Sequence, residues 1–323
     1  KVLEWGRLMS YLEQSTRYIS YDSRFGGRYR YYRDPEIMDS SFGARYIGDM
    51  DRIFDTYAHL VPQMQDFVRD QFPKHPDDGD FVYRQAVKAK AFDALRGLLP
   101  AASLSNVGIY GTGQAYEALL LRMRSHPLPE SRYYADLMLR ELRKVIPSFL
   151  ERVDREDRGV VWSEYLQETR EDTADVVAAL FPEGSIVDPS PTVRLVDFDP
   201  EGEVKMIASM MYPHSTMSED QLERRVAGMN HEDRMAVARA YVGDRRNRRH
   251  KPGRALERPF YRFDVLVDYG AFRDLQRHRM LSMDWQNLSP HHGYISSPLV
   301  NAAGMGAVYE EAMERSAALY DLL

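Results

Sequence analysis

The stretch R-L-M-S-Y-L-E-Q-S-T-R-Y, residues 7–18, contains the residues from which the function of this chain can first be inferred. Arg17 and Ser15 can offer a guanidinium and a hydroxyl to one anion, and arginine supplies the fixed fork of donors that suits a phosphate. Glu13 can accept a hydrogen bond from a sugar hydroxyl or orient the loop. The stretch therefore predicts an anion-binding loop. The alternative is a salt-bridged surface loop, because exposed ion pairs are common.

A second arginine-rich stretch, R-H-R-M-L-S-M-D-W-Q-N, occupies residues 277–287. Its triplet Arg277, His278 and Arg279 can hold an anion and stabilise a negatively charged ring system. The alternative is a basic helix end, which the helix dipole favours. This alternative accounts well for Arg279 and less well for the three residues together.

The first stretch resembles the signature of the flavin-dependent thymidylate synthases, also called thymidylate synthase complementing proteins, which is R-H-R-x-x-S-x-N-E-x-S-x-R-Y. Trp5 and Gly6 stand where the family has Arg and His, and Leu12 stands where it has Asn. The matching residues are the last arginine of the triplet and most of the nucleotide half, namely Arg7, Ser10, Glu13, Ser15, Arg17 and Tyr18.

The second stretch resembles the same signature with the opposite half preserved. The triplet 277–279 and Ser282 are intact, whereas Asp284 and Trp285 replace the family's Asn and Glu. Asn287 and Ser289 replace the Ser and Arg that follow. Two complementary matches in one chain indicate an internal duplication.

Residues that flank both stretches also follow the family pattern. Glu257 precedes Arg277 at the distance of the glutamate in the family's H-x-S-P-x-E-H loop, although the histidines of that loop are not kept. After the first stretch, Arg96 precedes a Leu-Pro pair, and Arg122 begins an R-x-x-x-H-x-x-x-E pattern. The family's N-x-R ahead of that pattern is absent from this sequence.

The resemblance implies an α+β fold built from two tandem repeats, each with a twisted sheet flanked by helices. Residues 1–153 would be the C-terminal part of a first repeat, and residues 192–323 the N-terminal part of a second. Residues 154–191 would be a linker, because they are charged and punctuated by proline and glycine. We expect a pseudo-twofold axis between the repeats, and a native chain extended by about a hundred or more residues on each side.

The spacing of apolar residues predicts the secondary structure. Residues 1–45 are rich in Tyr, Arg and Gly and predict an irregular loop with stacked side chains. Alternation predicts strands at 193–198 and 261–267, and residues 103–113 predict extended chain. Helical periodicity predicts helices at 46–72, 81–98, 116–123, 131–150, 201–211, 219–228, 231–242, 271–279 and 307–323.

The resemblance implies methylation of dUMP to dTMP with methylenetetrahydrofolate and reduced FAD, which NADPH reloads. The family residues that bind the nucleotide are matched by Glu13, Ser15, Arg17, Arg96 and Arg122. Those of the flavin site are matched by Glu257, Arg277, His278 and Arg279. Arg122 would be catalytic, because a cation near the pyrimidine can stabilise negative charge on the ring.

The first half of the chain matches the nucleotide-binding residues of the family, and the second half matches its flavin-binding residues. We therefore expect one composite site made by both halves. The two arginine clusters should face each other across a cleft, within one chain or across a dimer interface. Because a family active site forms between subunits of a homotetramer, a homodimer of two-repeat chains is expected. The alternative is a decayed homologue that binds a nucleotide or a flavin, or serves as a scaffold, since catalytic sites tolerate little misplacement. The presence of both Arg122 and Arg277 favours the enzyme.

The amino-acid composition argues against several other classes of protein. The net charge of -6 argues against a nucleic-acid partner, and the absence of cysteine excludes a cysteine nucleophile. With no apolar run near 18 residues, we expect no membrane span and a cytoplasmic location. No metal site is expected, because His291 and His292 have no third ligand at a suitable spacing. The basic segment 245–251 predicts either a solvated loop or a phosphate tether.

Overall fold

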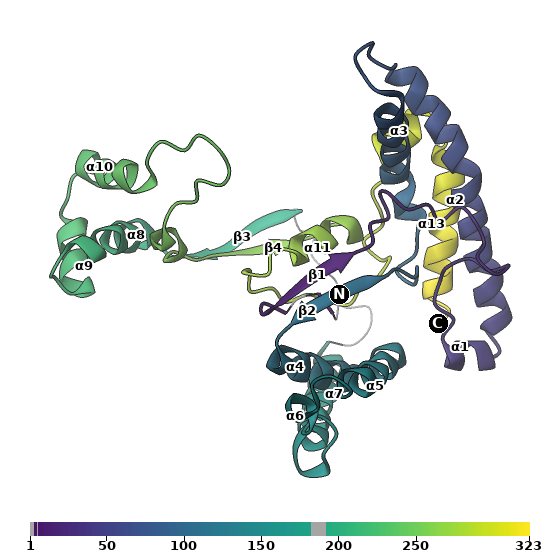
Figure 1. Ribbon diagram of the computed structural model, residues 1–323, viewed down its shortest axis with the longest axis horizontal. Coiled ribbons are helices and arrows are strands. Elements are labelled where there is room, and N and C mark those ends of the chain that lie inside the picture. The colour runs from purple at the N-terminus through teal and green to yellow at the C-terminus, as the bar shows by residue number, and fades with distance from the viewer. Residues whose placement is uncertain (1–2, 5, 182–191) are drawn as a thin grey trace. The chain divides into compact units, whose positions relative to one another are not determined.

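The computed structural model of the protein describes residues 3–4, 6–181 and 192–323. The chain forms two compact units, shown in Figure 1. The first unit contains residues 1–185 and 268–323, and the second contains residues 186–267. In sequence, the second unit is therefore inserted between two parts of the first.

The main core of the first unit is built by helices from both ends of the sequence, namely α2 (Gly43–Gln71), α3 (Asp80–Leu95) and α13 (Gly306–Tyr320). Phe54, Tyr57 and Met64 of α2 recur at helical spacing and are fully buried. Figure 1 shows α13 lying along α2, and Arg315 of α13 pairs with Asp49 of α2 at 3.0 Å. The C-terminal segment is thus an integral part of this core.

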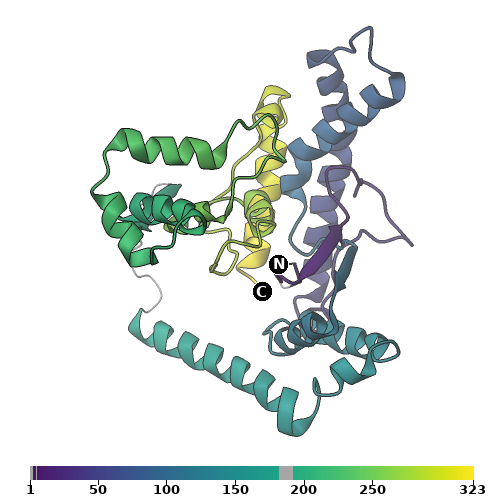
Figure 2. The ribbon, with the colours of Figure 1, turned by 60° about the vertical axis from the view of Figure 1, so that its left-hand side comes forward.

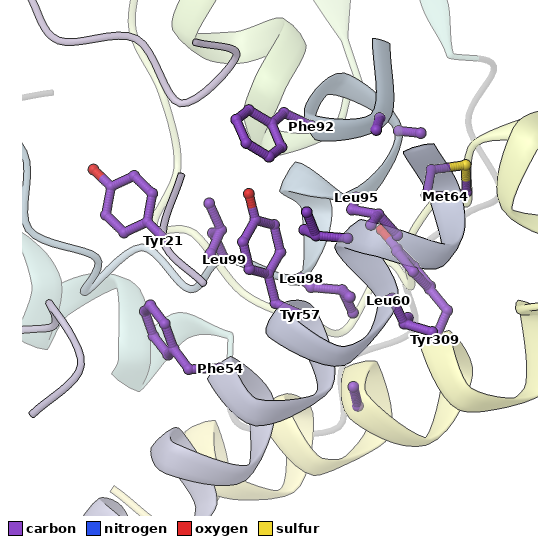
Figure 3. Packing of buried hydrophobic residues seen from close by; sticks show 14 of the residues in the cluster. Tyr21, Phe54, Tyr57, Leu60, Met64, Phe92, Leu95, Leu98, Leu99 and Tyr309 are labelled. Carbon is purple, nitrogen blue, oxygen red and sulfur yellow. The ribbon is translucent and has the colours of Figure 1, made fainter. Parts of the chain in front are cut away.

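Figure 3 shows this core from close by, with Phe92 and Tyr309 among the side chains that fill it. The Tyr309 hydroxyl lies against Gly97, the middle residue of the 3-10 turn η1 (Arg96–Leu98) that follows α3. A Cβ atom at position 97 would collide with this hydroxyl, so any larger residue there would force Tyr309 or the turn to shift. Helix α13 therefore helps to hold the turn that carries Arg96.

A two-stranded antiparallel sheet lies next in the first unit. Strand β1 (Met9–Glu13) pairs with β2 (Val107–Gly111), and Met9 lies opposite Gly111. Thr112 then caps the following helix with its side chain, as threonine commonly does. Buried residues of β1 and of three helices form a second, smaller core. The helices are α4 (Gly113–Arg124), α5 (Pro129–Leu142) and α6 (Pro147–Leu150).

The expected linker 154–191 is largely helical, and its role as a linker stays a prediction. A π-helical turn, η2 (Glu156–Val160), leads into α7 (Val161–Leu180), the long helix in teal in Figure 2. Residues 161–180 are rich in good helix formers, and this propensity outweighs the charge pattern that suggested a linker. Most of α7 is exposed. Residues 182–191 of the predicted linker lie outside the described residues.

The second unit consists of a β-ribbon and a small helical cluster. Strands β3 (Val193–Phe198) and β4 (Tyr261–Val265) pair antiparallel, with an irregularity between Leu195 and Asp197. Ile207, Leu222 and other apolar residues form the core of the cluster. Its elements are α8 (Gly202–Met211), η3 (Tyr212–His214), α9 (Glu219–Ala227), α10 (His231–Val242) and η4 (Arg254–Glu257).

Three local structures that were predicted from the sequence differ from those observed. The segment 1–45 contains β1 and also the short helix α1 (Pro35–Asp39). The helix predicted at 131–150 is two helices, because α5 ends at Leu142 and a proline begins α6. The helix predicted at 271–279 is α11 (Tyr269–Gln276), so the triplet 277–279 lies in the turn after it.

The α+β class is confirmed, whereas the tandem repeats stay a prediction. The described residues contain two two-stranded sheets. The two signature stretches also differ, because residues 9–13 form β1 while residues 282–289 have no regular structure. Repeats are defined by ancestry and compact units by contacts, so the repeat boundaries stay predictions as well.

A short helix, α12 (Pro298–Ala302), completes the fold. Among the described helices, none is long and apolar enough to cross a membrane.

Candidate functional site

The two arginine-rich stretches meet at Glu13, the last residue of β1. Arg277 donates from Nη2 to Glu13 Oε2 at 2.6 Å, and Arg273 pairs with Oε1 of the same carboxylate. Arg273 and Arg277 are four residues apart, so they project from one face of α11 and the turn that ends it. The side chain of Glu13 is only 12% exposed. A largely buried carboxylate thus joins segments that are distant in sequence.

Arg7 and Arg279 hold the same position in the two stretches, and each donates hydrogen bonds to the other stretch. Arg7 donates from Nε to the carbonyl oxygen of Arg279 at 3.1 Å and from Nη2 to Ser282 Oγ at 3.3 Å. In return, Arg279 donates from Nη1 to the carbonyl oxygen of Met9 at 3.3 Å. Each arginine therefore donates to the stretch that carries the other, although the acceptors do not occupy equivalent positions in the two stretches.

A cavity of about 250 Å³ lies beside this contact, lined by Glu4, Tyr11, Leu12, Glu13, Arg277 and Arg279. The Arg279 guanidinium lies over the Tyr11 ring, 4.8 Å from its centroid. Burial, and then the negative charge of Glu13, raise the pKa of the Glu4 carboxyl. Guanidinium groups beside an aromatic face suit a planar or anionic group, and the volume corresponds to a single ring system rather than a whole dinucleotide.

Arg122 of α4 lies close enough to this cavity to influence Tyr11. Burial raises the pKa of the Tyr11 hydroxyl, whereas its contact with Gly6 and the positive charges of Arg279 and Arg122 lower it. Burial lowers the pKa of the Arg122 guanidinium, which remains a cation at neutral pH because arginine begins above 12. A half-buried cation thus stands near the cavity.

A second carboxylate, Asp93 of α3, joins Arg17 and Arg96. Asp93 Oδ1 lies 2.9 Å from Arg17 Nε and 3.3 Å from Arg96 Nε. Arg17 Nη2 lies 3.9 Å from Asp274 of α11. Ser15 Oγ accepts a hydrogen bond from the backbone N–H of Arg17 at 3.2 Å, which shapes the loop after β1. The two arginines, both predicted to bind the nucleotide, therefore converge on one carboxylate oxygen.

Two of the predicted residues are not brought into these clusters. His278 is exposed on the turn after α11. Glu257 belongs to the second unit, where it pairs with Arg254 at 3.1 Å, so its relation to the flavin residues stays a prediction. The basic segment 245–251 is exposed and also belongs to the second unit. In the parts of the chain that the structure describes, no three metal-binding side chains come together.

Sequence reasoning missed Arg273, Asp93 and Tyr11, although each had a signal. Arg273 is four residues before Arg277, and Asp93 is three before Arg96, which are the spacings of neighbours on a helix. Tyr11 precedes Glu13 by two residues, and such residues share a face of a strand. These signals became meaningful only once the helix and the strand were known.

Residues 3–148 match the family model of the thymidylate synthase complementing proteins. The whole chain is also similar to longer proteins, each named as a UPF0159 protein. One from Chlamydia pneumoniae is 40% identical over 324 residues, which is 99% of this chain and 61% of that protein. One from Chlamydia muridarum is 36% identical over 327 residues, covering 100% of this chain and 61% of the relative. UPF0159 protein Ta1429 of Thermoplasma acidophilum is 29% identical over 353 residues, covering 100% and 68%.

The described structure and its sites are those of an α+β protein with arginine clusters suited to anions. Through residues 3–148, the chain is similar to the thymidylate synthase complementing protein family. The matched region contains Glu13, Arg17, Asp93, Arg96 and Arg122, and it ends before α11. The chain spans 61% of the length of the two chlamydial relatives.

Proposed function

We propose that this chain builds a composite site of the flavin-dependent thymidylate synthase type, which methylates dUMP to dTMP. The first signature stretch would hold the nucleotide, and the second would hold the flavin. The bridge from Glu13 to Arg273 and Arg277 carries the proposal, because it places the preserved half of one signature against the preserved half of the other. Both halves belong to the first unit of one chain.

On the nucleotide side, Arg17, Arg96 and the Ser15 hydroxyl would bind the dUMP phosphate. The two guanidinium groups approach one point from different segments, which suits the several oxygens of a phosphate. Glu13 would accept from a ribose hydroxyl or keep the loop oriented toward α11. The loop and the turn η1 would therefore fix the position of the nucleotide.

Arg122 would act on the pyrimidine ring. The sequence has no cysteine that could attack the ring, so the nucleophilic carbon must be activated without a covalent bond to a thiolate. A half-buried guanidinium can stabilise negative charge on the uracil and thereby make this carbon more nucleophilic. Its place near Tyr11, a wall of the cavity, supports this role.

On the cofactor side, the residues present fit part of a flavin. Arg277 and Arg279 offer donors to an anionic ring or phosphate, and the Tyr11 ring offers a flat face. The cavity corresponds to one ring system, so the rest of FAD would lie outside it. When bound, the flavin would supply the hydride. The arginines would bind and orient the reacting groups, and such positioning lowers the entropic part of the barrier.

The remaining participants follow from the same proposal. Methylenetetrahydrofolate would supply the methylene group and NADPH would reduce the flavin. Glu257 and His278 would complete the cofactor site by analogy with the family. A homodimer of two-repeat chains in the cytoplasm would be the working assembly.

A binding protein without catalysis is the second candidate. It is favoured by the pairing of site arginines with carboxylates of the chain itself, which any ligand must disturb. It is also favoured by Gly6, which stands where the family has His and whose backbone N–H donates to the Tyr11 hydroxyl at 3.1 Å. Such a protein would bind dUMP or flavin and form no dTMP.

The two halves of the site can be tested separately with two variants. Arg122→Ala should weaken dUMP binding by about ten- to a hundredfold in calorimetry, because a charged contact contributes about 1.5–3 kcal/mol, while flavin absorbance is retained. Arg277→Ala should show the opposite pattern. Arg224→Ala, which removes an exposed arginine of α9, is the matched control and should change neither ligand.

The outcomes separate the candidates. Flavin and dUMP binding together with dTMP formation supports the enzyme, and binding of both without dTMP supports the second candidate. If wild-type protein is colourless and binds no dUMP, or if neither variant alters either ligand, the composite site is wrong.

A further inference from the structure

Asp93 lies where an anionic group of a ligand would have to lie in the proposed nucleotide site. Its carboxylate contacts Arg17, which follows β1, and Arg96, which follows α3. Asp274 approaches Arg17 from the other side. These four side chains carry two positive and two negative charges, so the carboxylates offset the attraction that the two arginines would exert on a phosphate.

The surroundings of Asp93 allow its side chain to move while its backbone stays fixed. The neighbouring residues Phe92, Ala94 and Leu95 are buried in the main core. The Asp93 side chain is itself 50% exposed, so it can turn into solvent at small cost. Displacement of this carboxylate therefore requires no change in α3.

The Arg17 guanidinium is incompletely satisfied by Asp93. Its Nε is a buried atom 2.9 Å from Asp93 Oδ1, yet among the described residues it makes no hydrogen bond of suitable geometry. A buried donor without a well-aligned acceptor is unfavourable, and a phosphate oxygen can approach from a better direction than the tethered carboxylate. The pairing thus holds Arg17 in place and leaves it open to a stronger acceptor.

We propose that Asp93 is an internal counter-ion that holds Arg17 and Arg96 together and leaves them when a phosphate monoester binds. This inference rests on the proposed nucleotide site and concerns its selectivity. A phosphate dianion can displace the carboxylate because it carries more charge and more acceptor oxygens, whereas a singly charged carboxylate ligand gains nothing by the exchange. Asp93 is therefore a specificity-determining residue that selects ligands with a terminal phosphate.

The test compares wild-type protein with Asp93→Asn by calorimetry, with inorganic phosphate, dUMP and acetate as probes. Removing the internal charge should tighten phosphate and dUMP binding by about two- to fivefold, the range expected for partly exposed ion pairs. Acetate should bind the variant measurably better than it binds the wild type. The gain should shrink at high ionic strength, because salt screens partly exposed charges.

Two further variants serve as controls. Asp93→Glu keeps the carboxylate and should bind phosphate like the wild type. Asp66→Asn on α2 removes an aspartate with the same spacing to an arginine, Arg69, outside the proposed site, and should change no affinity. Thermal unfolding of each variant verifies that it is folded.

The results separate failure of this inference from failure of the proposed function. If wild type and Asp93→Asn bind dUMP equally, or if the variant binds it more weakly, the counter-ion role is overturned while the nucleotide site stands. If neither protein binds phosphate or dUMP, both the site and the inference are overturned. The inference is supported if Asp93→Asn binds phosphate and dUMP more tightly than the wild type does, while Asp93→Glu binds them like the wild type.

Discussion

Two carboxylates of the first unit each join a pair of arginines, but they do so in different environments. Glu13 is 12% exposed and joins two arginines from one face of α11. Asp93 is 50% exposed and joins arginines from two separate segments. An ion pair shielded from water is costly to break, whereas an exposed one contributes little. The comparison therefore assigns a stabilising role to the Glu13 bridge and a displaceable role to the Asp93 bridge.

The largest effect is expected at Glu13. Glu13→Ala would leave Arg273 and Arg277 without their shared partner and should lower the free energy of unfolding by about 1.5–3 kcal/mol. Urea unfolding measures this change. Glu311→Ala removes an exposed partner of Arg315 and, as the control, should cost no more than about 0.5 kcal/mol. Equal losses in both variants would mean that the Glu13 bridge stabilises the fold no more than an exposed ion pair does.

Arg96, one of the two arginines that Asp93 joins, lies in a turn against which α13 packs. This packing can be tested at Gly97. Gly97→Ala places a Cβ atom against the Tyr309 hydroxyl in a closed core, and overpacking of this kind costs about 1–3 kcal/mol. Because Gly97 follows Arg96, the variant should also weaken dUMP binding. Gly48→Ala in α2 has open space around its Cβ and should stabilise the helix by about 0.5–1 kcal/mol. A tolerated Gly97→Ala would show that this turn is not held by α13.

The pH dependence of stability should reflect the same core. Burial raises the pKa of Tyr309 to about 12, and burial likewise raises the pKa of Tyr31 and Tyr46 to about 12. A folded pKa above the usual value near 10 means that the unfolded chain loses these protons first. This contribution to stability is complete below pH about 10 and declines as the pH rises toward about 12. Urea unfolding across this range should show the decline, and Tyr309→Phe should reduce it.

The smallest change in stability is expected for Asp93→Asn. Its two ion pairs are partly exposed, so the loss should be within about 1 kcal/mol, although ligand affinity changes more clearly. The midpoint of thermal unfolding, measured beside Glu13→Ala, provides the comparison. A loss as large as that of Glu13→Ala would mean that Asp93 is a structural residue and not a displaceable one.

Much of the local structure could be predicted from the sequence. The periodicity of α2 and the alternation at 193–198 predicted these elements, and the proline at 147 could have predicted the break between α5 and α6. Strand β1 was missed because its five residues lie in a Tyr- and Arg-rich segment, and its pairing depends on β2, which is far away in sequence. Pairing over such a separation leaves no trace in a local pattern.

The sequence by itself determined which side chains can bind anions. Arg17, Arg96, Arg122, Arg277 and Arg279 were all singled out by their match to the motifs of the family that the sequence resembles. Their carboxylate partners could not be found in this way, because a carboxylate may pair with any nearby arginine and the sequence does not say which one is near. Only the tertiary structure, by packing α13 on α2 and placing α11 beside the end of β1, decided that Glu13 joins Arg273 and Arg277. The same packing set the exposures of Glu13 and Asp93, and exposure determines how strongly each bridge holds.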